Sequence, residues 1–94
     1  MANEIHYVEH CPICEQGLVR IRATIDDAGQ MYGCVVCDEC ESTWTDPTMK
    51  TRFIQTNPEK PVCPASGIAL WGESSHWADK AEMSLLGWYK RRKR

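Results

Sequence analysis

Two pairs of cysteines constrain the fold of this chain more than any other feature. Two residues separate Cys11 from Cys14, and the same spacing recurs in Cys37 and Cys40 after an interval of 22 residues. A tight turn between two such cysteines lets both sulfur atoms point the same way, while amides of the turn donate hydrogen bonds to them. Two such turns joined by a hairpin can supply four thiolates, which is the ligand set of a closed, structural zinc site. The sequence therefore predicts one structural Zn²⁺ bound by all four cysteines.

The segment between the two cysteine pairs has the pattern of a β-hairpin. Residues 17–25 alternate in polarity, with the odd-numbered residues from Val19 to Ile25 on one face, as in a half-buried strand. Residues 26–29 read Asp-Asp-Ala-Gly and supply turn chemistry. Residues 31–36 are predicted to form the returning strand. This path places the second cysteine pair opposite the first.

With these features, residues 8–46 resemble the zinc-ribbon family. The resemblance rests on the two cysteine pairs and on Trp44, four residues after the last of them, where ribbons frequently carry an aromatic residue packed against the turn. The chain differs from many ribbons at Glu15 and Glu41, because glycine often follows each second cysteine in that family. The resemblance implies a zinc-stabilised hairpin with unusually acidic turns.

The other two cysteines leave a different ligand set open. Cys34 is also separated by two residues from Cys37, so Cys34 and Cys37 could form the second pair instead. We prefer the pair Cys37 and Cys40, because polar residues and a tryptophan follow Cys40, as expected for a turn that leads into a strand. Cys34 and Cys63 are predicted to be small buried apolar residues. For Cys63 we expect no nearby partner and no base that lowers its pKa. Two histidines are further candidate ligands, but we expect them at the surface because four cysteines already fill the site: His6 and His10.

The length of the chain predicts one small domain, or one metal-stabilised unit with a dependent extension. Ninety-four residues bury a limited fraction of their surface. We expect a small α+β fold, with a zinc-ribbon hairpin or three-stranded sheet over residues 1–46 and a C-terminal extension over residues 47–94 packed on the ribbon. The first residues have neither a basic start nor an apolar run, and no segment approaches the roughly 18 apolar residues of a membrane span. A cytoplasmic protein with reduced thiols is therefore expected.

The extension is predicted to contain a strand and a helix. Residues 49–56 are the candidate third strand. A helix is expected over about residues 75–86, because Ser74 or Ser75 can cap its start, apolar residues recur every three or four positions, and Gly87 is placed to end it.

Charge is distributed unevenly along the chain. Residues 1–46 carry two basic and nine acidic side chains, whereas residues 47–94 carry nine basic and four acidic ones. Four thiolates on one zinc ion add further negative charge to the first half. The metal end is therefore expected to be anionic and to attract basic partners. The basic tail, residues 90–94, is most often a solvated terminus and can also contact RNA or an acidic protein.

Two functional classes are less favoured. An enzyme is not expected, because four cysteines close the zinc coordination sphere and no catalytic triad, phosphate-binding loop or apolar carboxylate pair is found. A redox role suits two matched cysteine pairs less well than metal binding does. Nucleic-acid binding is the alternative to protein binding, as a transcription or translation accessory that uses the basic tail, but an acidic ribbon opposes it.

The preferred prediction is non-catalytic binding of a basic protein. Complementary charge speeds encounter and fixes orientation. Small bacterial immunity proteins and antitoxins, which block a toxic enzyme, are similar in this combination of an acidic face and a paired-cysteine ribbon. The predicted contacts are five acidic residues with a tryptophan as anchor: Asp26, Asp27, Asp38, Glu39 and Glu41, with Trp71 or Trp77.

Overall fold

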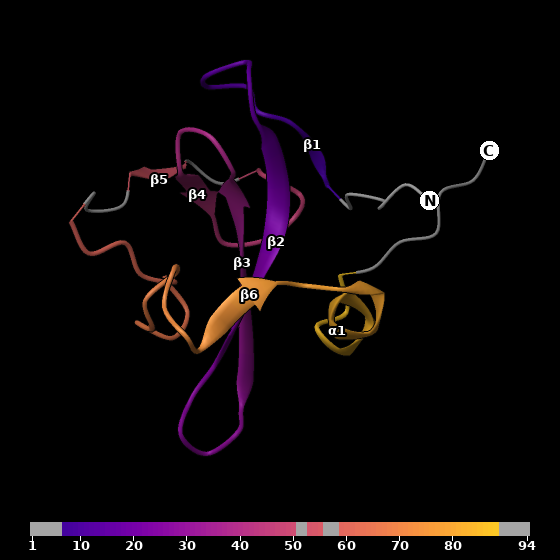
Figure 1. The fold of residues 1–94 in the computed structure, drawn as a ribbon. Helices are drawn as coiled ribbons and strands as arrows, with labels where there is room; N and C mark the ends of the chain where they lie inside the picture. Colours follow the sequence, from indigo (N-terminus) through magenta and orange to yellow (C-terminus); the bar gives the residue numbers. More distant parts are fainter. Residues whose placement is uncertain (1–6, 51–52, 56–58, 89–94) are drawn as a thin grey trace, which may run out of the picture.

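The computed structural model describes residues 7–50, 53–55 and 59–88. These residues form a curled antiparallel sheet of six strands and one short helix (Figure 1). Strands β1 to β5 are neighbours in chain order, and β6 pairs with β2. The elements are β1 (Glu9–His10), β2 (Leu18–Ile25), β3 (Met31–Cys37), β4 (Ser42–Trp44), β5 (Ile54–Gln55), β6 (Ser75–Trp77) and α1 (Lys80–Leu85).

The β2–β3 hairpin is the centre of the sheet and confirms the predicted pair of strands. Seven cross-strand pairs join the two strands, from Val19 opposite Cys37 to Ile25 opposite Met31. Strands β1 and β6 pair with successive parts of β2, while β4 extends the sheet from β3. The hairpin therefore carries one cysteine turn before β2 and the other directly after β3.

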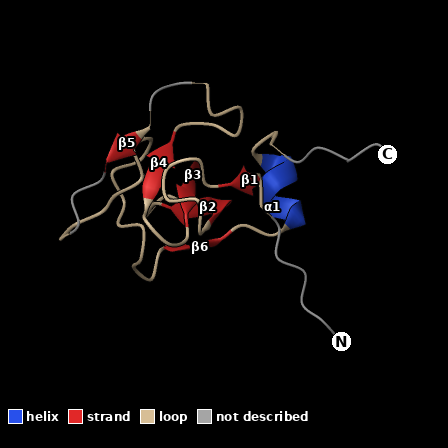
Figure 2. Cartoon of the chain, turned by 90° about the horizontal axis from the view of Figure 1, so that it is seen from above, coloured by secondary structure: helices blue, strands red, loops and turns tan. Residues whose placement is uncertain are grey.

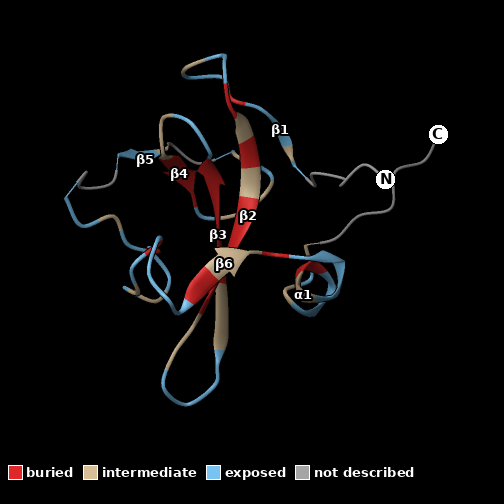
Figure 3. Ribbon diagram, viewed as in Figure 1, coloured by how far each residue is buried: buried red, intermediate tan, exposed pale blue. Residues whose placement is uncertain are grey.

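Both faces of β2 are covered, so the prediction of a half-buried strand is correct for one face and wrong for the other. Val19, Ile21 and Ala23 lie in the main core, as the alternating pattern predicted. Arg22 and Thr24 on the opposite face are buried as well. Figure 3 shows β2 coloured as buried or intermediate along its length. The opposite face is covered by the C-terminal half of the chain, which the local pattern of β2 does not reveal.

A second, smaller core lies on that opposite face. It contains Cys34, Val36, Cys63 and Leu70. Successive residues of a strand point to opposite faces, so even-numbered residues of β3 enter this small core and Val35 and its odd-numbered neighbours enter the main core. The two cores are therefore separated by the hairpin itself.

The predicted helix over residues 75–86 begins too early. Residues 75–77 form β6 and pair with residues 22–24 of β2, because strand pairing with the hairpin outweighs the local helical spacing. The helix starts after Asp79, whose carboxylate accepts the Glu82 amide while the Glu82 side chain accepts the Asp79 amide, a capping box. Figure 2 shows α1 and the edge strand β5 at opposite ends of the view, with the other strands between them.

The predicted end of the helix at Gly87 is confirmed. Gly87 has a φ of 78°. Its amide donates to the Ser84 carbonyl at 3.0 Å, and the Trp88 amide donates to the Met83 carbonyl at 2.8 Å, which is a Schellman motif. This end of the helix brings the Trp88 ring close to β3. A β-carbon added at Gly33 would lie only 2.8 Å from the ring, so glycine leaves the space that Trp88 needs.

The third strand of the sheet is not the one that was predicted. Residues 42–44 form β4, directly after the second cysteine turn, and Trp44 is buried there. Of the predicted strand over 49–56, residues 54–55 form β5, whereas residues 51–52 and 56 lie outside the described part of the chain. In the ranges that the structure describes, no helix has both the length and the apolar character needed to cross a bilayer.

Candidate metal centre

Four cysteine thiols meet at one end of the hairpin. The Sγ atoms of Cys11 and Cys40 lie 3.7 Å apart, as do those of Cys14 and Cys37. All four sulfur atoms lie within 4.8 Å of one another. Among the described residues, this is the only group of three or more histidine, cysteine or acidic side chains that could hold a metal ion. The four thiols can therefore hold one metal ion.

The two cysteine turns have the same backbone geometry. The Glu15 amide donates to the Cys11 carbonyl at 3.0 Å, and the Glu41 amide donates to the Cys37 carbonyl at 3.1 Å. Both glutamates adopt a left-handed conformation, with φ of 60° and 65°. Each turn thus places its two sulfur atoms on the same side and ends on a residue with positive φ.

Backbone amides are directed at three of the four sulfur atoms. The amides of Ile13 and Gly17 lie 3.3 and 3.4 Å from the Sγ atoms of Cys11 and Cys14. The Cys37 Sγ receives two amides, from residues 39 and 40, at 3.3 and 3.4 Å. Hydrogen bonds of this kind stabilise thiolates, which are the form that binds metals.

Two thiols of the cluster have shifted pKa values in opposite directions. Backbone hydrogen bonds from Gln16 and Gly17 lower the pKa of Cys14 to about 7. Burial raises the pKa of Cys37 to about 12. Metal binding must therefore release a proton from Cys37 at neutral pH, whereas Cys14 is already partly ionised.

Gly17 lets the two turns approach each other. A β-carbon at this position would lie 2.6 Å from the Cys37 Sγ and 2.7 Å from Glu39. The Gly17 carbonyl also accepts the Cys11 amide at 3.0 Å, which fixes the first turn. Sequence reasoning did not single out Gly17, although its place between a cysteine turn and a strand is a position where close backbone approach is common.

Neither histidine considered as a ligand belongs to the described cluster. His10 is exposed in β1, and its ring packs edge-on against Tyr7 at a centroid distance of 5.4 Å. His6 lies outside the described residues. The choice of Cys40 over Cys34 agrees with the structure, because Cys40 joins the cluster and Cys34 lies in the small core.

The five acidic residues predicted to bind a partner fall into two groups. Asp26 and Asp27 lie at the turn between β2 and β3, whereas Asp38, Glu39 and Glu41 lie in the second cysteine turn at the other end of the hairpin. Strand β2 has eight residues, which separates these ends by about 25 Å. The structure therefore does not bring the five together as one surface.

Two of these acids have structural contacts. Asp26 Oδ1 accepts the Ala28 and Gln30 amides at 2.9 Å, and the hydrogen bond from Gln30 is the main reason why the pKa of Asp26 is lowered. Asp38 accepts the Leu18 amide at 2.9 Å and forms an ion pair with Arg20 at 3.8 Å. Asp27 and Glu39 are exposed, and Glu41 is half-buried.

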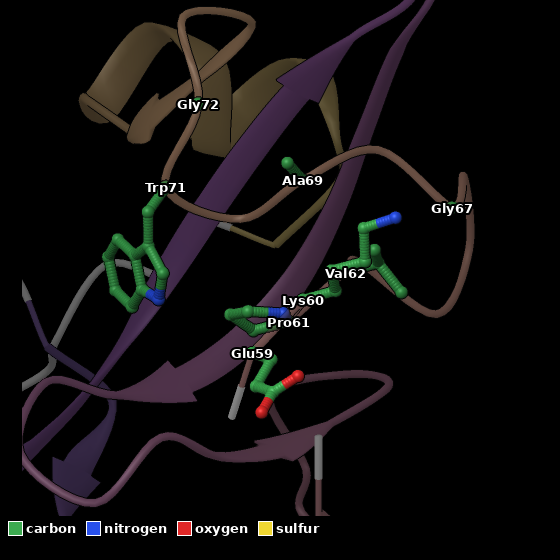
Figure 4. A pocket seen from close by; sticks show the side chains of 8 residues that line it. All are labelled: Glu59, Lys60, Pro61, Val62, Gly67, Ala69, Trp71 and Gly72. Carbon is green, nitrogen blue, oxygen red and sulfur yellow. The ribbon is translucent and has the colours of Figure 1, made fainter. Parts of the chain in front are cut away.

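The two predicted tryptophan anchors belong to a stack of rings and guanidinium groups. The Arg20 and Arg22 guanidiniums lie 4.2 and 4.8 Å from the Trp77 ring centre, and Arg22 lies 4.5 Å from that of Trp71. Trp77 is thereby held within the fold. Trp71 is 41% exposed and lines an open hollow of about 510 Å³ with Pro61 and Val62 (Figure 4).

The prediction that Cys63 has no nearby partner is wrong. Cys34 and Cys63 are both fully buried, as expected for small apolar residues, but they lie together in the small core, where each shifts the pKa of the other. The partner was missed because it lies 29 positions earlier in the sequence, on β3.

The candidate metal centre rests on the geometry of this chain alone. Comparison with protein-family models, with curated proteins and with solved structures finds no match. Membership of the zinc-ribbon family therefore stays a prediction, whereas the clustering of the four thiols is a structural finding.

Proposed function

We propose that this chain is a non-catalytic zinc-binding module that binds a basic protein through its acidic metal end. Zinc is supported by the spacing of the sulfur atoms. Zn–S bonds of about 2.3 Å place the corners of a tetrahedral site about 3.8 Å apart. Two sulfur pairs lie at 3.7 Å. Four thiolates leave no position for a substrate, so the ion has a structural role.

The metal end combines several negative charges with no positive charge in the turns. Residues 11–17 and 37–41 contain four carboxylates, from Glu15, Asp38, Glu39 and Glu41, and no basic residue. Zinc with four thiolates carries a further net charge of about −2. A basic protein surface is the natural complement of this end of the molecule.

The observation that carries the proposal is the conformation of Glu15 and Glu41. Both have positive φ, a conformation that costs a non-glycine residue about 1 kcal/mol. Glycine adopts it at little steric cost. A chain that keeps glutamate at both positions loses stability and gains negative charge beside the metal, which favours a role for the charge itself.

An exposed apolar side chain lies among these carboxylates. Ile13 is 46% exposed at the tip of the first cysteine turn, between Cys11 and Glu15. Interfaces commonly combine a central apolar contact with a charged rim. We therefore infer that Ile13 is the apolar contact of this surface, while Trp71 remains a candidate anchor for a larger partner.

The arginines of the ribbon favour protein over nucleic acid as the partner. Arg20 is paired with Asp38, and Arg22 is buried and donates to the Leu70 carbonyl at 2.7 Å. Neither guanidinium is available to neutralise phosphates in the way that nucleic-acid binding requires. An inhibitor of a cationic enzyme, as immunity proteins and antitoxins are, is the concrete form of the proposal.

Charge reversal at the two ends of the hairpin tests this proposal with a matched control. Glu39→Lys reverses a charge at the metal end, and Asp27→Lys makes the same change at the exposed far turn. The immobilised zinc-loaded chain should capture basic proteins from an extract of its native host, and Glu39→Lys should abolish the capture while Asp27→Lys retains it. Equal loss in both variants, or binding of nonspecific DNA that salt removes, would contradict the proposal.

A further inference from the structure

The second pair of cysteines forms a separate thiol site on the other face of the hairpin. Cys34 comes from β3 and Cys63 from the loop whose residues Val62 and Ala69 form an isolated bridge. Both cysteines are free thiols with no exposed surface, enclosed by Val36 and Leu70. The two side chains lie together in this small core, at a site that the metal centre does not use.

The turn that holds Cys63 repeats the backbone of the two metal-binding turns. The Gly67 amide donates to the Cys63 carbonyl at 2.7 Å, and Gly67 has a φ of 74°. Residues 63–67 read Cys-Pro-Ala-Ser-Gly, so a serine stands where the metal-binding turns have their second cysteine. This third turn presents one sulfur atom, where each of the others presents two.

Several donors converge on the Cys63 sulfur. They are the Cys34 thiol, the Ser66 hydroxyl and the backbone amides of Ala65 and Ser66, and together they lower the pKa of Cys63 to about 5, with the Cys34 hydrogen bond contributing most. The same hydrogen bond and burial raise the pKa of Cys34. The two sulfur atoms therefore compete for one proton, and loss of that proton leaves one thiolate in the pair.

Arg22 supplies positive charge beside this pair. Arg22 lies directly opposite Cys34 in the sheet, is 7% exposed, and interacts electrostatically with Cys34. Within the described residues, no carboxylate forms an ion pair with Arg22. A buried arginine without a carboxylate partner favours loss of one proton from the Cys34–Cys63 pair beside it.

We propose that Cys34 and Cys63 are an oxidisable dithiol that reacts with hydroperoxides to form a disulfide, independently of the metal centre. The Cys63 thiolate attacks one peroxide oxygen: an S–O bond forms, the O–O bond breaks, and hydroxide leaves. Cys34 then attacks the sulfenic sulfur: an S–S bond forms, the S–O bond breaks, and the hydroxyl group leaves as water with the Cys34 proton. Two thiol sulfurs are oxidised and the peroxide is reduced.

The position of Cys63 suits a small oxidant. Cys63 lies directly beneath a surface turn, with Val62, Pro64 and Ala65 exposed around it. A hydroperoxide is small and needs only a local opening of this turn, whereas a bulky disulfide oxidant needs the loop to detach. The resulting disulfide ties the loop to β3 and leaves the four metal-binding thiols on the other core untouched.

Peroxide treatment of the zinc-loaded full-length chain tests the proposal. We expect the intact mass to fall by about 2 Da as two hydrogens are lost, and tryptic mapping to show residues 23–50 joined to residues 53–80 through Cys34 and Cys63. Zinc content should stay unchanged. The melting temperature should rise and return to its starting value on reduction.

Two matched variants separate the roles of the thiols. In Cys34→Ala, Cys63 loses both its resolving thiol and the main cause of its lowered pKa, so peroxide should oxidise it more slowly and stop at a sulfenic acid that dimedone traps. In Cys63→Ala, Cys34 should remain a thiol. Release of zinc with disulfides among the metal-binding cysteines, while Cys34 and Cys63 stay reduced, overturns the proposal. So does a second metal equivalent that Cys63→Ala removes. If either variant fails to fold, peptide mapping of the unaltered chain still decides.

Discussion

The same backbone turn occurs three times in this chain, twice at the metal centre and once on the opposite face of the hairpin. In each case the amide four residues after a cysteine donates to that cysteine's carbonyl, and the donor residue has positive φ. The metal-binding turns have a second cysteine before that residue, Cys14 and Cys40, whereas the third has Ser66. The turn therefore presents a sulfur atom to hydrogen-bond donors, and the residue at its fourth position determines whether the turn carries a second sulfur atom.

The comparison also separates two uses of thiol chemistry. At the metal centre, two turns face each other and four sulfur atoms lie within 4.8 Å of one another. At the third turn, Cys63 faces a strand residue, Cys34, in an apolar core. Four sulfur atoms suit a metal ion, whereas two in contact suit a disulfide.

The largest expected effect comes from removing one buried cysteine at each place. Cys37→Ala should abolish stoichiometric zinc binding and cooperative unfolding, because structural zinc supplies about 10 to 16 kcal/mol in small metal-dependent folds. Cys63→Ala should keep about one zinc per chain and destabilise the fold by about 1 to 3 kcal/mol, since it removes a small buried group.

Metal analysis and thermal unfolding followed by circular dichroism measure both outcomes. A Cys37→Ala chain that keeps its zinc and its unfolding transition would show that the four-thiol cluster is not the structural centre. Loss of zinc in Cys63→Ala would remove the distinction between the two sites.

The hairpin and the cysteine cluster could be predicted from the sequence because both depend on local spacing. Two residues between cysteines fix a turn, and alternating polarity fixes a strand and its core face. The register from Val19 to Ile25 then follows from the short connection between the strands. These features need no information about distant parts of the chain.

The contacts of the C-terminal half could not be predicted in the same way. Trp77 is the first of a series of apolar residues at helical spacing, yet residues 75–77 pair with β2. The Arg22 side chain also holds the preceding loop by donating to the Leu70 carbonyl. The meeting of Cys34 with Cys63 depends on that loop. The sequence analysis did not use the likeness of Cys63-Pro64 to Cys11-Pro12, which is the one sequence signal that could have indicated the third turn.

Ser66→Cys would sharpen the comparison by giving the third turn its second cysteine. The Ser66 hydroxyl contacts Cys63 and lies 2.9 Å from the Thr24 hydroxyl, so a sulfur atom there joins Cys34 and Cys63 in a three-thiol group. We expect the number of cadmium ions bound per chain to rise from about one to about two, with a matching rise in thiolate–cadmium absorption.

Ser66→Ala is the control, since it removes the hydroxyl without adding a sulfur atom and should bind about one cadmium ion. An unchanged stoichiometry in Ser66→Cys, in a chain that folds, would mean that the turn alone does not determine metal binding.

Gly17→Ala tests how closely the two metal-binding turns must approach. The added β-carbon would lie 2.6 Å from the Cys37 Sγ, so the turns must separate. Zinc affinity, measured by competition with a chelator, should fall about tenfold or more. Gly29→Ala is the control at the far turn, because it strains the backbone at a φ of 85° without a clash and far from the four thiols. Equal zinc affinity in the two variants would show that the cluster tolerates a wider spacing.

The smallest expected effect concerns the last residue of the turns, and it connects their geometry to the proposed function. Glu15→Gly relieves the left-handed conformation of the glutamate and should stabilise the zinc-loaded chain by about 0.5 to 1 kcal/mol. Gly67→Ala makes the opposite change in the third turn, where no atom lies within 4 Å of the new β-carbon, and should destabilise by about 1 kcal/mol.

Denaturant unfolding measures both changes in stability, and Glu15→Asn separates conformation from charge because asparagine tolerates positive φ. If the glutamates serve partner binding, Glu15→Gly and Glu15→Asn should weaken capture of the basic partner to the same extent, because both remove the negative charge. The two variants should differ only in stability, because glycine and asparagine differ in their preference for positive φ. Unchanged capture in both variants, together with the gain in stability, would mean that the negative charge at Glu15 has no part in binding.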